Sequence, residues 1–155
     1  MTNGPARPRR SQAELHAASD RLWHEYWMLR CVARAAADDA ATAHALEESF
    51  ALHLRNLHRF LYPTGVVDGE VTAEDFLGEE WVSNPPAPSA LLLEAVARAE
   101  LRLSPIRYEA PAAPRSWTLL QASFDFQKVM DPFVSSTPRH LLGPRWKIAY
   151  EDVVV

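Results

Sequence analysis

Proline and glycine are distributed very unevenly along this chain of 155 residues. Neither occurs between Arg9 and Tyr62, whereas ten of the twelve prolines lie at or beyond Pro63. Proline removes a backbone donor and clashes with the preceding helical turn, so long helices need stretches without it. The sequence therefore predicts two long helices before Pro63 and shorter, more interrupted elements after it.

The first helix is expected from Ser11 to about Ala37. Ser11 and Glu14 have the spacing of a capping box. Apolar residues then recur every three or four positions, as in an amphipathic helix. A second bulky group lies beside this stripe and consists of Trp23, Trp27, Met28 and Cys31. We interpret that group as core or as a helix-to-helix contact, in preference to a cofactor pocket.

The second helix is expected from about Ala40 to Tyr62, where Pro63 and Gly65 stop it. Its apolar stripe consists of Leu46, Phe50, Leu57 and Leu61, with His53 at the edge. The opposite side carries Glu48, Arg55 and Arg59, and Asn56 lies on the flank. Glu48 and Arg55 are two turns apart, about 10.5 Å along the axis, so they are not expected to pair directly.

Shorter elements follow. We expect a connection at 66–88 with one helical turn at Thr72–Leu77, a third helix at Ser89–Leu103 ended by Pro105, and a fourth from Ser116 to about Val129 or Phe133. Trp117, Leu120 and Phe124 form one face of that fourth helix. The predicted fold is all-α, a four-helix, mostly up-and-down bundle with an irregular C-terminal extension. The expected divisions are a disordered start (1–10), the helical bundle (11–137) and a C-terminal arm (138–155).

Composition excludes several functional classes. The apolar runs are far shorter than the ~20 residues of a membrane span, and a single cysteine fits a reducing, cytoplasmic compartment. Fourteen arginines against two lysines suit phosphate binding, yet the net charge is −4, so no basic footprint dominates. Phosphate loops, CxxC pairs and HExxH segments are missing, and His53 and His58 point about 140° apart on a helix. The sequence predicts neither a metal site nor a cofactor.

One segment is more specific. Glu48-Ser-Phe-Ala-Leu-His53-Leu-Arg55-Asn56-Leu57, followed by Phe60-Leu61-Tyr62, resembles the second helix of a bacterial group of HEPN-like helical proteins. Downstream, Ala73-Glu-Asp75-Phe76, the segment from Arg102 to Arg107, and Trp117 are similar to later parts of that group. The resemblance covers roughly Leu46 to Trp117, about half of the chain.

The resemblance implies a bundle that often dimerises and, in many members, cuts RNA without a metal. Catalytic members place a histidine about four to six residues after an arginine and a polar residue; the histidine moves the 2′-hydroxyl proton and the arginine stabilises the phosphate. In this chain Arg55–Asn56 supplies the start, but His58 follows Arg55 by only three residues, and Arg102 stands where the group has histidine.

Two hypotheses follow. The first is a HEPN-like, non-catalytic helical module that binds a protein partner or RNA as a homodimer. The alternative is a metal-independent endoribonuclease of a toxin–antitoxin or phage-defence system, with Arg55, Asn56 and His58 as catalytic candidates. In either case the candidate polar cluster consists of Glu48, His53, Arg55, Asn56, Arg102 and Arg107. The same residues could also be structural, bridging helices or bonding helix ends.

Overall fold

A computed structural model describes residues 9–65, 69–105 and 118–146. The described residues form helices and no strand, which confirms the all-α class. The helices are α1 (Gln12–Arg34), α2 (Ala40–Leu61), α3 (Ala73–Leu77), α4 (Glu79–Ser83), α5 (Ala90–Arg102) and α6 (Leu119–Ser136), followed by a 3₁₀ turn, η1 (Arg139–Leu141).

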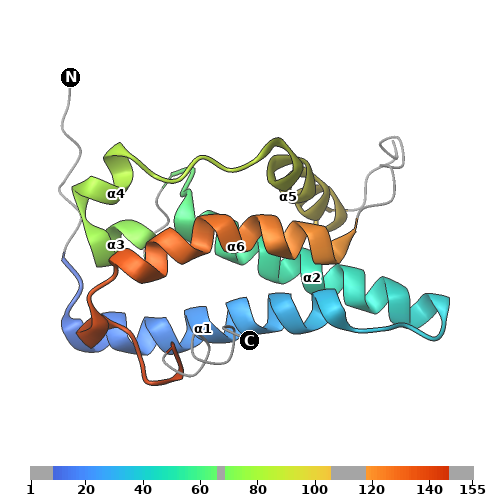
Figure 1. Cartoon of the computed structure of the whole chain (residues 1–155), viewed down its shortest axis with the longest axis horizontal. Coiled ribbons are helices and arrows are strands. Elements are labelled where there is room, and N and C mark those ends of the chain that lie inside the picture. Colours follow the sequence, from blue (N-terminus) through green and yellow to red (C-terminus); the bar gives the residue numbers. More distant parts are fainter. Residues whose placement is uncertain (1–8, 66–68, 106–117, 147–155) are drawn as a thin grey trace.

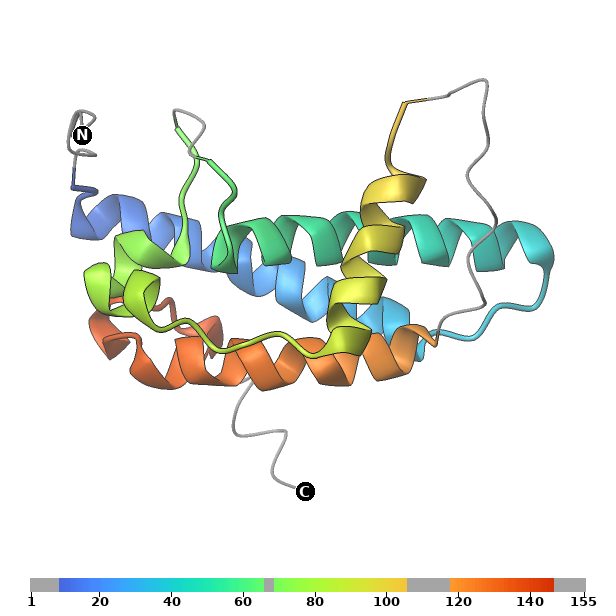
Figure 2. The same ribbon diagram turned by 90° about the horizontal axis from the view of Figure 1, so that it is seen from above.

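Three of the long helices run side by side and one lies across them (Figures 1 and 2). α1, α2 and α6 extend along the long axis of the molecule, whereas α5 crosses over α2 and α6. The up-and-down arrangement expected from the sequence therefore describes three helices, and α5 departs from it. No helix among residues 9–65, 69–105 and 118–146 is long and apolar enough to cross a membrane.

The capping signals of the sequence place the helix starts correctly. The Ser11 backbone N–H donates to Glu14 Oε2 (2.7 Å), and the Glu14 N–H donates to Ser11 Oγ (3.2 Å), which is the expected capping box of α1. Asp39 caps α2 by accepting from the Thr42 N–H at 2.8 Å. α1 ends at Arg34, earlier than the expected Ala37.

The region between α2 and α5 holds two short helices, where only one turn was expected. Gly78, with φ +68°, ends α3 and starts α4 in a backbone region that favours glycine. Trp81 of α4 is buried and its indole N–H donates to the Leu61 carbonyl at 3.1 Å. α4 therefore closes the C-terminal end of α2.

α6 differs from the expected fourth helix in length and in its buried face. It continues through Pro132 to Ser136, because the burial of Phe126, Met130 and Phe133 offsets the one backbone bond that proline removes. Leu120 and Phe124, which were expected on one face, lie on the more exposed side of α6 and are 38% and 43% exposed. Ser116 and Trp117 lie outside the described residues.

The described part of the C-terminal arm, residues 138–146, packs against α1. Trp146 is buried, stacks on Tyr26 with ring centroids 6.2 Å apart, and donates its indole N–H to the Ser19 carbonyl at 3.0 Å. The Gly143 N–H donates to Ser19 Oγ at 2.8 Å. The arm is thus part of the chain's own core.

Candidate functional site

A buried polar cluster joins α1 to α2. His53 Nδ1 lies 2.7 Å from Glu25 Oε2, and Asn56 Nδ2 donates to the same oxygen at 3.3 Å. The side chains of Glu25 and His53 are only 13% and 10% exposed. We call Glu25, His53 and Asn56 the Glu25 cluster. It brings together two residues that the sequence singled out, around a carboxylate that the sequence analysis did not select.

The ionisation of Glu25 follows from these contacts. Burial alone would raise the pKa of its carboxyl group, but the hydrogen bonds from His53 and Asn56 outweigh burial, and the pKa of Glu25 is lowered. An ionised carboxylate only accepts hydrogen bonds, so His53 carries its proton on Nδ1. The cluster therefore holds α1 and α2 together best when Glu25 is charged.

This assignment predicts an acid-sensitive contribution to stability. Since the folded pKa of Glu25 lies below its ordinary value of 4.5, the stabilisation is present above that pH and is lost as the pH falls through the folded pKa. As the pH is lowered from above 4.5 through the folded pKa of Glu25, the thermal midpoint should fall less steeply in Glu25→Gln than in the unmodified protein. Glu48→Gln, at an exposed carboxylate on α2, serves as the control and should keep the original slope. Equal slopes for Glu25→Gln and the unmodified protein would contradict the assignment.

A pocket of about 450 Å³ opens beside the Glu25 cluster. Glu25 and Asn56 form part of its wall, with Arg21 and Arg59 also lining it. Arg21 is loosely held, since its side chain is 82% exposed and its Nη2 lies 4.0 Å from Glu25 Oε1. His53 does not line the pocket, so its ring acts as a support behind Glu25.

Arg102 belongs to a different contact. Its Nη1 lies 3.0 Å from Glu47 Oε2 and its Nη2 lies 3.2 Å from His44 Nδ1, which ties the end of α5 to α2. Glu47 makes this ion pair, whereas Glu48, the residue chosen from the sequence, is exposed. The predicted polar cluster therefore divides between two seams of the bundle, and Glu48 belongs to neither.

Arg55 and His58 lie on a third side of α2. Arg55 follows His53 by two positions, a rotation of roughly 200°, so their side chains leave α2 in nearly opposite directions. Arg55 Nε is buried and has no hydrogen-bond partner among the described residues. Burial lowers the pKa of His58, against the opposing effect of Glu100, and its ring lies 5.0 Å from that of Tyr62. Arg55 and His53 are thus not assembled around one reacting group.

Two further sequence expectations concern Arg107 and metal binding. Arg107 lies outside the described residues. Within the described ranges, no group of three histidine, cysteine, aspartate or glutamate residues is placed to hold a metal ion.

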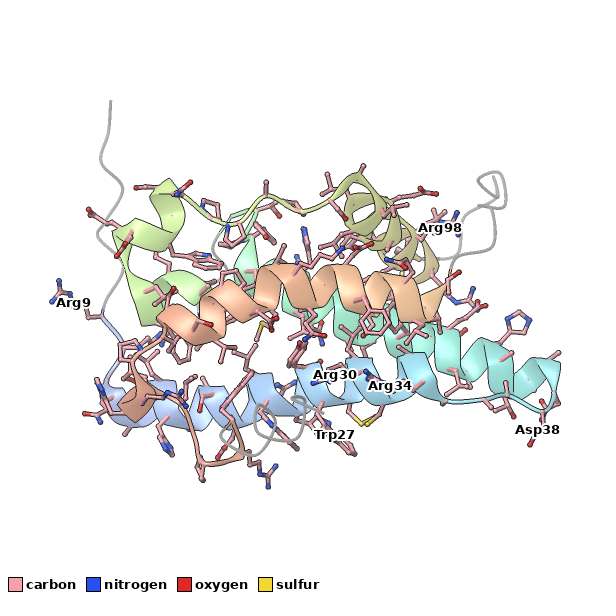
Figure 3. The ribbon with its side chains drawn as sticks, in the orientation of Figure 1. Arg9, Trp27, Arg30, Arg34, Asp38 and Arg98 are labelled. Atoms are coloured by element: carbon pink, nitrogen blue, oxygen red, sulfur yellow. The ribbon has the colours of Figure 1, made fainter. Side chains whose placement is uncertain are left out.

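A second candidate surface combines aromatic and arginine side chains on α1. Trp23 and Trp27 stack with ring centroids 5.8 Å apart, and Trp27 is 48% exposed. Arg30 and Arg34 follow on α1, seven and eleven residues after Trp23, and Figure 3 shows them at the edge of α1 that faces α6, with Trp27 at the opposite edge. We call these four residues, together with Arg145 and Phe124, the aromatic–arginine face.

The last two members come from other parts of the chain. The Arg145 guanidinium lies 5.3 Å from the centre of the Trp23 ring, and that of Arg34 lies 6.0 Å from the centre of Phe124. Trp23 Nε1 is buried and, in the part of the chain that the structure describes, has no hydrogen-bond partner. Packing of the C-terminal arm and of α6 beside α1 creates this surface, so only the tryptophan spacing could have indicated it from the sequence.

No family model, curated protein or solved structure matches this chain.

Proposed function

We propose that this protein is a non-catalytic, HEPN-like helical module that binds single-stranded RNA on the aromatic–arginine face. The observation that carries the proposal is the stacked, partly exposed Trp23–Trp27 pair on the same helix as Arg30 and Arg34. Proteins that bind single strands combine aromatic platforms for the bases with positive side chains for the phosphates. Arginine serves both purposes, because its planar guanidinium stacks and also bonds phosphate oxygens.

The contacts of the polar residues support binding without cutting. His53 and Asn56 are engaged by Glu25, Arg102 is engaged by Glu47, and Arg55 leaves α2 away from His53. Acid–base catalysis needs a histidine within hydrogen-bond reach of the reacting hydroxyl, with a phosphate-binding group close by. A structural role therefore explains more of the contacts of these residues than a catalytic role does.

Binding is tested by Trp27→Ala. A stacked base contributes roughly 1–3 kcal/mol, so this change should weaken binding of a labelled single-stranded RNA by about 5-fold to 150-fold. Because Trp27 is half-exposed, the thermal midpoint should stay close to that of the unmodified protein. Val82→Ala, at a valine of α4 that is 55% exposed, is the matched control and should leave the affinity unchanged. Equal affinity of Trp27→Ala and the unmodified protein would remove the proposal.

The alternative function is a metal-independent endoribonuclease, and the Glu25–His53 pair is the observation that favours it. A carboxylate that fixes the tautomer and orientation of a histidine is a recurrent feature of acid–base catalysis. In that case His53 joins Arg55, Asn56 and His58 as a candidate. A ribonuclease assay on total RNA with Arg55→Ala as the control separates the two functions, since cutting that disappears in the variant supports the nuclease.

We further propose a cytoplasmic homodimer. Leu93 and Leu101 lie about 80° apart around α5 and are 48% and 38% exposed, which supports burial of this side against a second copy. Cys31 is the single cysteine and is exposed, which suits a reducing compartment. Light scattering coupled to size-exclusion chromatography tests the assembly, and a strict monomer at micromolar concentration would rule out the dimer.

A further inference from the structure

A second pocket, of about 190 Å³, lies where α5 packs against α6. Arg98 of α5 and Asp125 of α6 both line it, and Figure 3 shows Arg98 on α5, on the far side of the molecule from α1. Their side chains are only 10% and 3% exposed. Two opposite charges this deeply buried on facing helices would ordinarily pair across the interface. Each instead pairs within its own helix.

Arg98 makes fewer hydrogen bonds than its guanidinium group can donate. Its Nη2 donates to Glu94 Oε1 at 3.0 Å, and within the described ranges this is its one hydrogen bond. A guanidinium has five N–H donors, so Arg98 has further donors that can bond to a molecule in the pocket. Glu94 lines the same pocket and is 59% exposed, so its ion pair with Arg98 lies at the solvent side of the pocket.

Asp125 also accepts fewer hydrogen bonds than its carboxylate can. Its Oδ1 accepts from Lys128 Nζ at 2.8 Å, whereas its Oδ2 accepts only a long bond of 3.4 Å from Gln121 Nε2. A carboxylate can accept about four hydrogen bonds. Lys128 is 70% exposed, so its contact is largely screened by water. One oxygen of a buried carboxylate is therefore available for a cationic donor.

The start of α6 adds a second feature that favours an anion. Thr118, the N-cap residue, lines the pocket, and its side chain makes no capping hydrogen bond. The first turn of a helix carries unpaired N–H groups and a partial positive charge. The pocket thus combines a positive part, at Arg98 and the start of α6, with a negative part at Asp125.

We propose that this pocket binds a small α-amino acid as a zwitterion, with its carboxylate on Arg98 and its ammonium group on Asp125. The volume corresponds to about six water molecules, which is room for a ligand of roughly six to eight non-hydrogen atoms. Alanine, serine and threonine have that size. The site is separate from the aromatic–arginine face and does not depend on RNA binding.

Calorimetric titration of the full chain with L-alanine, L-serine and L-threonine tests the proposal. We expect saturable binding of at least one of them. Two analogues of the amino acid that binds best then distinguish the two ends of the site. Its N-acetyl derivative lacks the ammonium group and its amide lacks the carboxylate, and each should bind at least about tenfold more weakly.

Variants assign the binding to this pocket. Arg98→Gln and Asp125→Asn each keep much of the side-chain shape while removing the charge, and each should weaken amino-acid binding at least about tenfold. Arg102→Gln is the matched control on α5, because Arg102 pairs with Glu47 outside the pocket, and it should keep the original affinity. Circular dichroism on each variant establishes that it is folded; if Arg98→Gln is unfolded, Asp125→Asn and the two analogues decide the matter.

Three results would overturn the proposal. The first is no saturable binding of any of the three amino acids at about 10 mM, a concentration that detects even millimolar affinity. The second is equal binding of the N-acetyl derivative, which would indicate an anion site without a role for Asp125. The third is unchanged affinity in folded Asp125→Asn.

Discussion

Leu57→Asp is expected to abolish the folded state. Leu57 is 1% exposed in the C-terminal half of α2, and an aspartate there would place an unpaired carboxylate in the apolar core. The cost of an unpaired buried charge is several kcal/mol, and domains of this size have about 5–15 kcal/mol of total stability. We expect loss of the cooperative thermal transition and of near-ultraviolet circular dichroism.

The matched control is Leu52→Asp on the same helix. Leu52 is 40% exposed, so the same substitution should change the free energy of unfolding by less than about 1 kcal/mol. A normal transition for Leu57→Asp, or unfolding of Leu52→Asp, would show that the helical phase of α2 is wrong.

Trp146→Ala should also be strongly destabilising, although Trp146 lies in the C-terminal arm. Its indole stacks on Tyr26, is 2% exposed and donates to the Ser19 carbonyl, so the change leaves a cavity and removes a buried hydrogen bond. Truncation of a buried tryptophan costs about 3–5 kcal/mol, which corresponds to a fall in thermal midpoint of about 6–20 °C for a chain of this length.

Trp27→Ala is the control for residue type. The two tryptophans differ in exposure, 48% for Trp27 and 2% for Trp146, so only the Trp146 variant should lose much stability. If both variants melted alike, the arm would not be part of the core in the way that its contacts indicate.

The helices that local signals define were predicted well. Ser11 with Glu14 and Thr72 with Asp75 form capping boxes, and Ser89 caps α5, since these contacts lie within three residues of each other. Pro63 and Pro105 lie just beyond α2 and α5 for the same local reason. Local chemistry is present in the sequence itself, so one sequence is enough to find it.

The features that depend on packing between distant segments were missed. Glu25 was not predicted as a site residue, because nothing near it in sequence identifies His53, 28 positions away, as its partner. Leu120 and Phe124 have helical spacing but lie on the exposed side of α6, since Phe126, Met130 and Phe133 form a larger apolar face. Arg98 and Asp125 were not predicted as binding residues, because the burial of a charged side chain is visible only once the helices are packed.

The prediction that the binding residues form one cluster was therefore only partly correct. His53 and Asn56 do meet, around Glu25, whereas Arg102 contacts Glu47 and Glu48 is exposed. On a helix, neighbours in sequence point in different directions, and each of these residues contacts whichever helix packs on its side. The HEPN-like resemblance, which covers roughly Leu46 to Trp117, stays a proposal.

The central claim is that this chain binds single-stranded RNA and does not cut it. The most direct measurement incubates the purified full chain with a single-stranded RNA labelled at both ends, and follows binding by fluorescence anisotropy and integrity on a denaturing gel. We expect saturable binding that Trp27→Ala weakens, with the RNA intact in every sample. RNA that is cut by the unmodified protein but left intact by Arg55→Ala would contradict it.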